Sequence, residues 1–264
     1  MQQVSDNMAG TNPTQDAVTG GPAIILVDPQ LGENIGTCAR AMLNCGLTDL
    51  RLVRPRDGWP NGRAQAAASG ADEVLEKARL FDTTAEAVAD LAHVFASTAR
   101  NRGMIKRIMT PREAAVEMRA QWAGGLTTGV LFGPERTGLV NDDLALADTS
   151  LTVPLNPAFS SLNLAQAVLL IGYEWYQAAD ETPGRYLHTG ATRAATKAEL
   201  VNLFGHLEEE LEKCGFFAAR EKKPSMIRAI RNCFQRMDMT EQEVRTFHGI
   251  VAGLTGRKKA NTKE

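Results

Sequence analysis

The sequence predicts an α/β protein with a parallel sheet covered by helices on both faces, followed by a small helical extension. Three observations lead to this prediction. Short apolar runs alternate with helical stretches from residue 22 to about residue 180, as is typical of buried parallel strands. Four of these runs lead directly into small, turn-forming and polar residues. Beyond about residue 195 the apolar pattern becomes wholly helical.

Strands and helices are expected to alternate along the first part of the chain. Strands are expected at residues 23–27, 50–53, 79–81, 94–96, 129–132 and 151–153. Helices are expected at residues 34–45, within 64–78, at 85–91, from residue 111, from residue 141, and at 162–179. The last of these helices is apolar nearly all round, so it must be buried on every side, either by the core or by a second subunit. In the extension, amphipathic helices are expected at residues 197–214, 225–237 and 240–254.

These patterns divide the chain of 264 residues into segments. We expect a disordered tail at residues 1–21, an α/β domain at 22–180, a linker at 181–195, a helical module at 196–256 and a basic tail at 257–264. The polar start lacks the charged and apolar regions of a secretory signal. No stretch approaches the roughly 20 apolar residues that cross a bilayer. The protein is therefore expected in the cytoplasm, away from membranes.

The overall charge excludes attraction to nucleic acid by the whole molecule, because the formal net charge is −2. Two local patches are basic. The first comprises Arg100, Arg102, Lys106, Arg107 and Arg112. The second spans residues 216–236, where the charges are Arg220, Lys222, Lys223, Arg228, Arg231 and Arg236 against Glu221 alone. Taken alone, either patch is equally well explained by a solvated surface.

The cysteines and histidines do not indicate a metal site. The four cysteines include no Cys-x-x-Cys pair, and no histidine lies at metal-ligand spacing from them. Cys38 and Cys45 lie seven residues apart on one face of a predicted helix. We expect both to be small buried apolar residues, and no metal is expected.

The four loops that follow apolar runs are the candidate site, because loops that leave parallel strands gather along one edge of the sheet. In the helix after the first loop, Thr37, Arg40 and Asn44 form a polar stripe where a substrate could meet it. Asn34 is a plausible N-cap of that helix. At the last loop, the hydroxyls of Ser160 and Ser161 would suit a helix start.

The third loop combines two glycines with one carboxylate. Gly133 and Gly138 permit close backbone approach to a bound molecule, although a turn without a ligand explains them almost as well. Glu135 lies between them and could hold a hydroxyl or a cation, or could be a surface charge. The residues alone do not choose between these alternatives.

Together and in this order, three motifs resemble those of the SpoU branch of the SPOUT RNA methyltransferases. They are Asn34-x-Gly36-x-x-x-Arg40, Gly133-x-Glu135-x-x-Gly138-Leu139 and Ser160-Ser161-Leu162-Asn163-Leu164-Ala165. Within this branch, the chain is similar to the subgroup that methylates the 2′-hydroxyl of cytidine or uridine at position 32 of the tRNA anticodon loop. The similarity covers residues 22 to about 256. One departure is Arg136, which stands where the wider branch usually has glycine.

The resemblance implies an enzyme that takes its methyl group from S-adenosyl-L-methionine and releases S-adenosyl-L-homocysteine. It also implies a trefoil knot, a homodimer and a tRNA substrate rather than DNA, since only RNA carries the 2′-hydroxyl. Cofactor contacts are implied for Ser97, Thr98, Ala99, Gly133, Val153, Ser160, Ser161, Leu162 and Asn163. With an RNA substrate, phosphate contacts are expected from Arg100, Arg102, Lys222, Lys223 and Arg228.

The resemblance assigns catalysis to Arg40, with Asn34 and Glu135 beside it. Arginine is a poor base because its pKa exceeds about 12. We therefore hypothesise that Arg40 grips an RNA phosphate and helps to polarise the ribose hydroxyl. In this hypothesis Asn34 holds Arg40 or the ribose, and Glu135 pairs with the guanidinium of Arg40 or with a residue of a partner subunit.

Three other functions are alternatives to this one. The enzyme could methylate another tRNA or rRNA position, or the chain could be a catalytically silent RNA-binding member of the fold. The intact motif residues Asn34, Arg40 and Asn163 argue against the silent form. A nicotinamide-dependent oxidoreductase would need Gly-x-Gly-x-x-Gly after the first strand, and the residues from Gly32 to Gly36 do not supply it.

Overall fold

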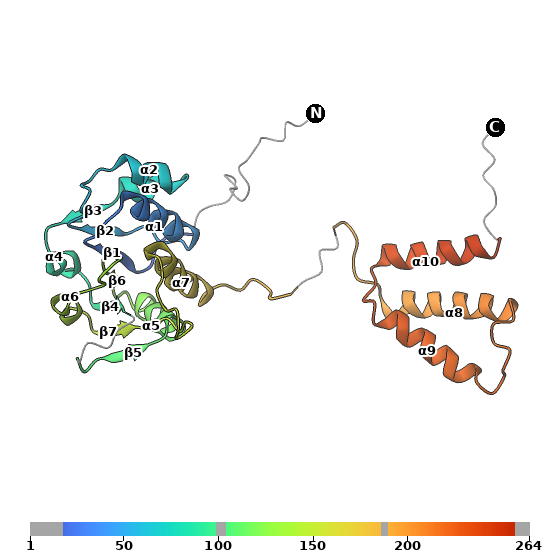
Figure 1. Cartoon of the computed structure of the whole chain (residues 1–264). Helices are drawn as coiled ribbons and strands as arrows, with labels where there is room; N and C mark the ends of the chain where they lie inside the picture. The colour runs from blue at the N-terminus through green and yellow to red at the C-terminus, as the bar shows by residue number, and fades with distance from the viewer. Residues whose placement is uncertain (1–17, 99–103, 186–189, 257–264) are drawn as a thin grey trace, which may run out of the picture. The chain divides into compact units, whose positions relative to one another are not determined.

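The structure is a computed structural model that describes residues 18–98, 104–185 and 190–256. The chain forms two compact units that divide between Thr182 and Pro183 (Figure 1). The first unit carries a sheet with seven helices, and the second carries three helices, as far as the described residues extend.

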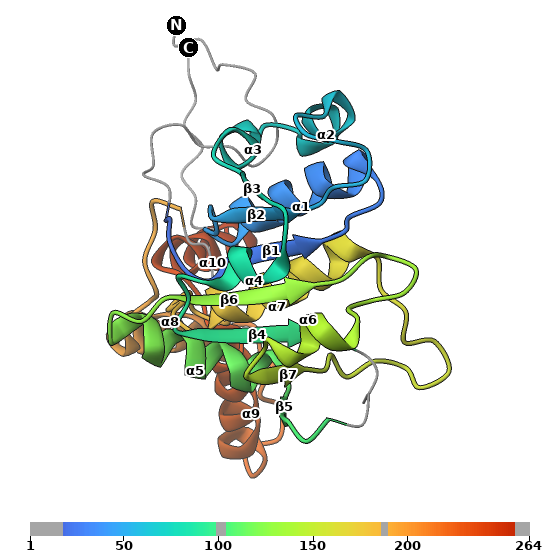
Figure 2. The same cartoon turned by 90° about the vertical axis from the view of Figure 1, so that its left-hand side faces the viewer.

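The described part of the first unit is built on a seven-stranded sheet in which every neighbouring pair of strands is parallel. The strand order is β3-β2-β1-β6-β4-β7-β5 (Figure 2). The strands are β1 (Ala23–Val27), β2 (Leu50–Val53), β3 (Arg79–Phe81), β4 (His93–Ser97), β5 (Arg107–Met109), β6 (Thr128–Phe132) and β7 (Thr149–Leu151). The predicted parallel α/β sheet is confirmed.

Helices cover both faces of this sheet. They are α1 (Gly32–Asn44), α2 (Gly62–Ala68), α3 (Asp72–Glu76), α4 (Thr84–Val88), α5 (Pro111–Ala123), α6 (Asn141–Ala145) and α7 (Leu164–Gln177). Successive residues of β1 point to opposite faces, as in any strand. Ile24 and Leu26 join a core with α1, α2, α3, α5 and α7, whereas Ile25 and Val27 join a core with α4 and α6. Both faces of β1 are therefore buried, which explains its unbroken apolar sequence.

Two strands at the β5 edge differ from the sequence prediction. The pattern did not predict β5, whose first two side chains, Arg107 and Ile108, are exposed, so no apolar run marks it. β7 lies two residues earlier than predicted. Thr149 of β7 is buried, and its Oγ1 lies 3.2 Å from His93 Nε2 on the neighbouring strand. The strand therefore begins with a buried, hydrogen-bonded hydroxyl and not with the apolar side chain by which the sequence pattern recognises a strand.

Helix α7 is buried on one side only, so the first of the two predicted alternatives, burial on every side by the core, does not hold. Val168, Ile171 and Trp175 pack into the core. Leu169 and Tyr173, on the opposite side, are 41% and 52% exposed. The core of this chain therefore does not enclose the helix. A second subunit is the alternative that the sequence left open.

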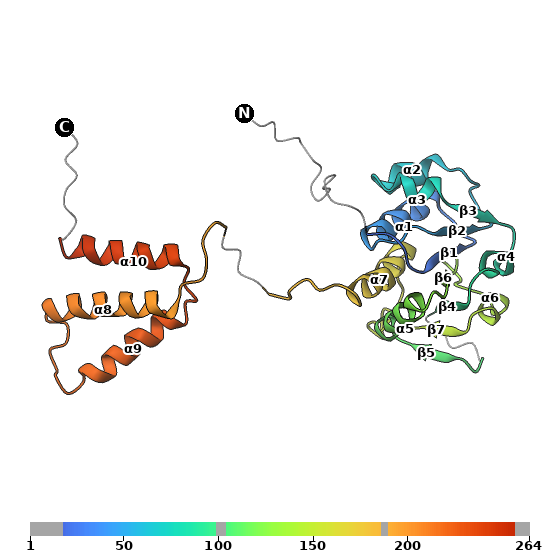
Figure 3. The ribbon, with the colours of Figure 1, turned by 180° about the vertical axis from the view of Figure 1, so that it is seen from behind.

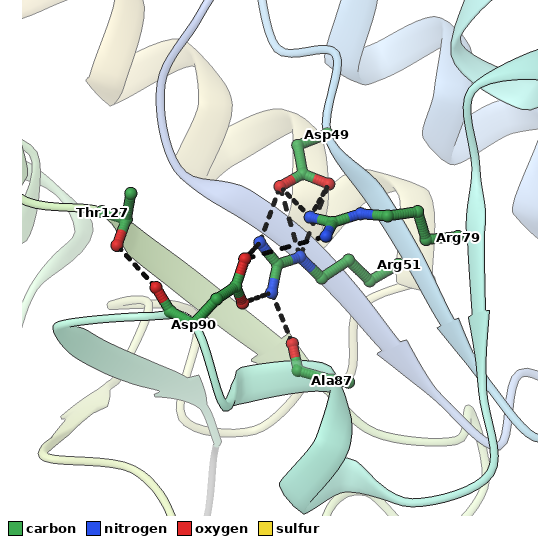
Figure 4. Close-up of polar contacts among 6 residues, drawn as sticks. All are labelled: Asp49, Arg51, Arg79, Ala87, Asp90 and Thr127. Atoms are coloured by element: carbon green, nitrogen blue, oxygen red, sulfur yellow. Dashed lines mark hydrogen bonds and ion pairs between the residues drawn. The ribbon is translucent and has the colours of Figure 1, made fainter.

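An ion-pair cluster lies where the strands have their amino ends (Figure 4). Arg51 of β2 is buried, and its guanidinium donates to the carboxylates of Asp49 and Asp90 and to the carbonyl of Ala87. Arg79 of β3 also donates to Asp49, at 2.8 Å. Hydrogen bonding to Arg51 lowers the pKa of Asp90 below its usual value, against the opposing effect of burial. The cluster joins β2, β3 and the end of α4.

The second unit consists of α8 (Lys197–Lys213), α9 (Lys223–Gln235) and α10 (Glu241–Leu254) (Figures 1 and 3). Thr196 and Thr240 cap α8 and α10 through reciprocal hydrogen bonds with the glutamate three residues later. A small core holds the unit together, made of Leu200, Leu203, Phe204, Met239 and Val244. Across α8 and α10, the rings of His206 and His248 stack with their Nδ1 atoms 2.8 Å apart. Among the described residues, no helix has the length and apolarity needed to cross a bilayer.

Candidate active site

The loops after β4, β6 and β7 surround one cavity of about 570 Å³ at the carboxyl edge of the sheet. Ser97 and Thr98 line it from the first loop, Gly133 from the second and Val153 from the third. Ser160, Ser161 and Leu162 line it from the segment before α7. Three of the four loops singled out in the sequence therefore share a single cavity.

The remaining loop reaches the same place through Asn34, on the first turns of α1. The Nδ2 of Asn34 donates to Glu135 Oε1 at 2.6 Å, and the Oδ1 of Asn34 accepts from Asn163 Nδ2 at 3.2 Å. The second oxygen of Glu135 accepts from the backbone N–H of Gln30 at 3.0 Å. The three motifs are thus joined side chain to side chain, although they lie far apart in the sequence.

Asn34 is not the N-cap of α1 that the sequence suggested. Leu31 occupies the cap position and makes no side-chain capping bond. Asn34 lies three residues further on, inside the first turn, and its amide is committed to Glu135 and Asn163. An amide can donate and accept at the same time, which a carboxylate or an ammonium cannot do. The bridging position therefore suits asparagine.

Asn163, rather than the serine hydroxyls, caps α7. Its Oδ1 accepts from the N–H of Ala165 at 2.9 Å, and the N–H of Asn163 donates to Gln166 Oε1 at 3.1 Å. Ser160 and Ser161 lie before the cap and line the cavity instead. One side chain, Asn163, thereby fixes both the start of α7 and the position of Asn34.

The loop after β6 is shaped by its two glycines. A Cβ on Gly133 would lie 2.2 Å from the backbone nitrogen of Leu139, so no other residue fits without moving the chain. Gly138 has a φ of +69°, in the region that favours glycine. Its N–H donates to the carbonyl of Pro134 at 2.8 Å. This closed turn presents Glu135 towards Asn34.

The cysteines near the site are structural. Cys38 and Cys45 are buried in the core beneath α1. Burial, and secondarily the charge of Glu135, raise the pKa of the Cys38 thiol well above its usual range. Burial raises the pKa of Cys45 to about 11. Both remain neutral thiols near pH 7, as small apolar residues would, and the prediction of a shared buried face is confirmed.

Arg40 lies on the exposed side of α1, beyond the cavity of its own chain. It follows Asn34 by six residues, which corresponds to about 9 Å along a helix axis. It does not line the cavity, and no hydrogen bond or ion pair links its side chain to any other residue that the structure describes. The expected pairing with Glu135 is not found within one chain, because Glu135 is bonded to Asn34 and Gln30.

The predicted RNA contacts fall into two groups. Arg100 and Arg102 lie outside the described residues, as does the expected cofactor contact Ala99. Lys222, Lys223 and Arg228 belong to the second unit. There Lys223 is paired with Glu212 at 2.7 Å. Glu208 of α8 similarly pairs with Arg231 of α9, at 2.6 Å. Acidic residues of α8 therefore offset part of the basic patch, which the sequence pattern of residues 216–236 did not reveal.

The charge of the cavity comes from two adjacent residues among those described. Glu135 and Arg136 are its charged lining residues, and the rest are apolar, hydroxyl-bearing or backbone groups. Sequence reasoning noted Arg136 only as a departure from a motif and gave it no role. Its adjacency to Glu135 in a loop of the site was the available signal. No group of three His, Cys, Asp or Glu side chains in the described ranges is arranged to bind a metal.

Comparison with known proteins identifies the family of the chain. Residues 21–173 match the model of the SpoU rRNA Methylase family, and residues 198–264 match that of the tRNA methyltransferase TrmJ, C-terminal domain. The tRNA (cytidine/uridine-2′-O-)-methyltransferase TrmJ of Escherichia coli strain 536 is 35% identical over 244 residues, covering 91% of this chain and 98% of that protein.

Solved structures agree as well. TrmJ from Z. mobilis ZM4 superimposes with a TM-score of 0.78 at 52% identity, covering 89% of this chain and 99% of that one. A probable methylase family protein from Haemophilus influenzae Rd KW20 gives a TM-score of 0.56 at 29% identity, covering 89% and 96%. Since one family model spans more than half of the chain and a close relative spans nearly all of it, the chain belongs to the SpoU family of RNA methylases, and within it to the TrmJ group of 2′-O-methyltransferases.

Proposed function

We propose that this enzyme transfers a methyl group from S-adenosyl-L-methionine to the ribose 2′-hydroxyl of cytidine or uridine at position 32 of tRNA. The observation that carries the proposal is the hydrogen-bonded junction of Glu135, Asn34 and Asn163 beside one cavity. The printed name of the E. coli relative supports a tRNA substrate and methylation at the 2′ oxygen. The anticodon-loop position follows from the resemblance of the motifs. The site of action would be the cytoplasm.

The residues of the cavity suit this cofactor. A volume of about 570 Å³ lies within the range of about 300–1,000 Å³ found for small-molecule sites. The lining from Ser97, Thr98, Gly133 and Val153 offers backbone groups and small side chains, which can approach an adenosine closely. Ser160, Ser161 and Leu162 would complete the enclosure, with Ala99 as a further contact in the proposal. Asn163 would act through Asn34 and the start of α7.

When bound, S-adenosylmethionine supplies a methyl group activated by a sulfonium centre. The chain's part is to align the ribose oxygen with that group, and alignment alone is worth about 7–11 kcal/mol in well-oriented model reactions. Arg40 would grip a phosphate next to the reactive ribose and help to polarise the hydroxyl, since a guanidinium binds phosphate through paired hydrogen bonds. Asn34, held by Glu135, would fix the position of the ribose.

A second copy of the chain would complete the site. Arg40 lies away from the cavity of its own chain, and the outer side of α7 exposes Leu169, Leu170 and Tyr173. Exposed apolar surface on a core helix is typical of a subunit interface. We propose a homodimer in which Arg40 of one chain serves the cavity of the other. A trefoil knot in the chain around the cavity is part of the same proposal.

The second unit would grip tRNA through its basic side chains. Lys222 and Arg228 have no ion-pair partner among the residues described here, so they are available to phosphates. Lys223 would contribute less, because Glu212 neutralises it. Arg100 and Arg102, outside the described residues, remain candidates for phosphate contacts.

The experiment that tests the function is mass spectrometry of total tRNA and rRNA from a strain that lacks the gene. Loss of the 2′-O-methyl group at nucleotide 32, restored by the purified enzyme with S-adenosylmethionine, is expected. Methylation lost at another tRNA or rRNA position would favour the first alternative. Intact methylation throughout, together with tRNA binding by the purified protein, would favour the silent RNA-binding alternative.

A further inference from the structure

Among the described residues that line the cavity, Arg136 is the one with a basic side chain. It follows Glu135 in the loop between β6 and α6 and is exposed. No hydrogen bond or ion pair joins its side chain to another residue within the described ranges. A guanidinium at the wall of a cavity, without a partner of its own, is available to an anionic ligand.

The neighbouring Glu135 does not neutralise Arg136 by contact. Both oxygens of Glu135 are hydrogen-bonded, one to Asn34 Nδ2 at 2.6 Å and the other to the N–H of Gln30 at 3.0 Å. These bonds hold the carboxylate on the α1 side of the loop. The two adjacent residues therefore differ in role. Glu135 bonds the loop to Gln30 and Asn34, whereas the side chain of Arg136 is available to a ligand.

The proposed cofactor has one anionic group, the carboxylate of its amino-acid part. A carboxylate that leaves water needs hydrogen bonds from charged or polar donors, and a guanidinium can offer two parallel N–H groups. The rest of the described lining offers hydroxyls, backbone N–H groups and apolar side chains. Arg136 is therefore the group that can compensate the full negative charge.

We propose that Arg136 binds the carboxylate of the amino-acid part of the cofactor, and so selects ligands that carry this part over adenosine thioethers that lack it. The inference rests on the proposed function. An RNA phosphate is the competing anion. The carboxylate is favoured because Arg136 lines the same cavity as Gly133 and Ser161, which would hold the remainder of the cofactor.

Isothermal titration of the full chain with two ligands tests the inference without relying on activity. S-adenosylhomocysteine carries the carboxylate, whereas 5′-methylthioadenosine has the same adenosine and a thioether but no amino-acid part. In R136Q, we expect the Kd for S-adenosylhomocysteine to rise about tenfold, as for loss of one charged hydrogen-bonding partner. The Kd for 5′-methylthioadenosine should change less than about twofold, and R136K should lose less affinity than R136Q.

The control is K77Q, which removes one exposed positive charge at the end of α3, away from the cavity. It should bind both ligands as the wild type does. Equal weakening of both ligands by R136Q would indicate a distorted loop and overturn the inference. Unchanged binding of both would also overturn it, and a loss of tRNA affinity in that variant would assign Arg136 to a phosphate. If the wild type binds neither ligand, the proposed function itself fails.

Discussion

At the scale of single residues, Asn34 and Arg40 show how one helix serves two purposes. Asn34 turns its amide towards Glu135 and Asn163 and is thus bonded to the loop of Glu135, which lines the cavity of its own chain. Arg40 lies about 9 Å further along α1, on the exposed side. The two residues of one motif therefore need not act on the same substrate molecule. The proposed second chain would bring an Arg40 to each cavity.

Replacement of Arg40 by alanine should abolish methyl transfer while leaving the affinity for S-adenosylhomocysteine near that of the wild type. The guanidinium would contact RNA, and it does not line the cavity. Single-turnover methylation of a tRNA transcript measures the first quantity, and isothermal titration measures the second. R40K should recover only part of the rate, because an ammonium lacks the planar fork. Turnover above about a tenth of the wild-type rate in R40A, a loss of less than about 1.4 kcal/mol, would contradict the assigned role.

The sequence indicated which residues of the site matter better than how they are connected. The loops around Ser97, Gly133 and Ser161 could be placed on one edge, because parallel strands leave little choice. The bond from Asn34 to Asn163 could not be predicted, since it depends on how distant segments meet. The same holds for Arg136, whose exposure to the cavity is a tertiary property.

At the scale of helices and strands, local signals placed the helices of the second unit to within two residues at either end. The capping threonines Thr196 and Thr240 each precede a glutamate by three positions, and such a pair marks a helix start from sequence alone. The signals missed β5 and placed β7 two residues too late. The first two side chains of β5 are exposed, and β7 begins with the buried hydroxyls of Thr149 and Ser150, so neither strand begins with an apolar run.

The contact between α8 and α10 should make the second unit sensitive to acid. His206 and His248 share one hydrogen bond between Nδ1 atoms at 2.8 Å, so at least one ring must be neutral. Burial, and then the charge of His206, lower the pKa of His248 below its ordinary value of 6.5. Below about pH 6.5 the unfolded chain takes up a proton that the folded unit resists, so stability falls as the pH falls. Above about pH 7.5 this cost is absent.

Thermal unfolding, followed by helical circular dichroism at pH 8.0 and 5.5, measures this effect. The wild type should lose more melting temperature on acidification than H248F, which keeps a ring on α10 but cannot take a proton. The rest of the chain is common to both proteins, so its contribution to the acid dependence cancels in the comparison. An equal loss in both proteins would rule out the histidine pair as the source of the acid sensitivity.

The ion-pair cluster at the amino edge should stabilise the sheet of the first unit. Replacing Arg51 by methionine keeps the aliphatic stem of the side chain but removes the guanidinium that bonds Asp49 and Asp90, and leaves Asp90 with the longer contact to Arg79 at 3.7 Å (Figure 4). Loss of one partner of a buried pair costs about 3–5 kcal/mol, but Asp90 is 55% exposed and keeps its contact with Arg79, so we expect a smaller cost of about 2 kcal/mol. Urea unfolding, read on a probe in the first unit, measures this change.

R112M is the matched control, since Arg112 forms an exposed ion pair with Glu174. It should change the free energy of unfolding far less than R51M does, because water screens an exposed ion pair. A similar loss of unfolding free energy in R51M and R112M would show that the buried cluster stabilises the sheet no more than an exposed ion pair does.

At the scale of the whole molecule, the division at Thr182 and Pro183 separates the cavity from the helices expected to grip tRNA. The amphipathic spacing predicted those helices. The neutralisation of Lys223 by Glu212 could not be predicted, because the two residues lie on different helices. The proposed knot is also invisible to local patterns, which carry no information about how the chain threads.

The salt dependence of tRNA binding should separate the basic residues of the second unit. Each phosphate contact contributes about 1 to the slope of log affinity against log salt concentration. The double variant K222Q/R228Q should lower that slope by about 2. K223Q should lower it by less, since Lys223 is already paired. Filter binding over a salt series measures the slopes. Equal slopes in the wild type and the double variant would remove the second unit from the RNA contact surface.

The bridge made by Asn34 sets an order of events during synthesis. Its two side-chain partners are added 101 and 129 residues later, so no shorter product from the ribosome can hold the junction. At about 5–20 residues per second, the interval to Asn163 is on the order of ten seconds. Until then a nascent chain carries the first motif without the means to orient it. An unfinished copy of the enzyme therefore lacks this junction, because the partners of Asn34 lie 101 and 129 residues further along the sequence.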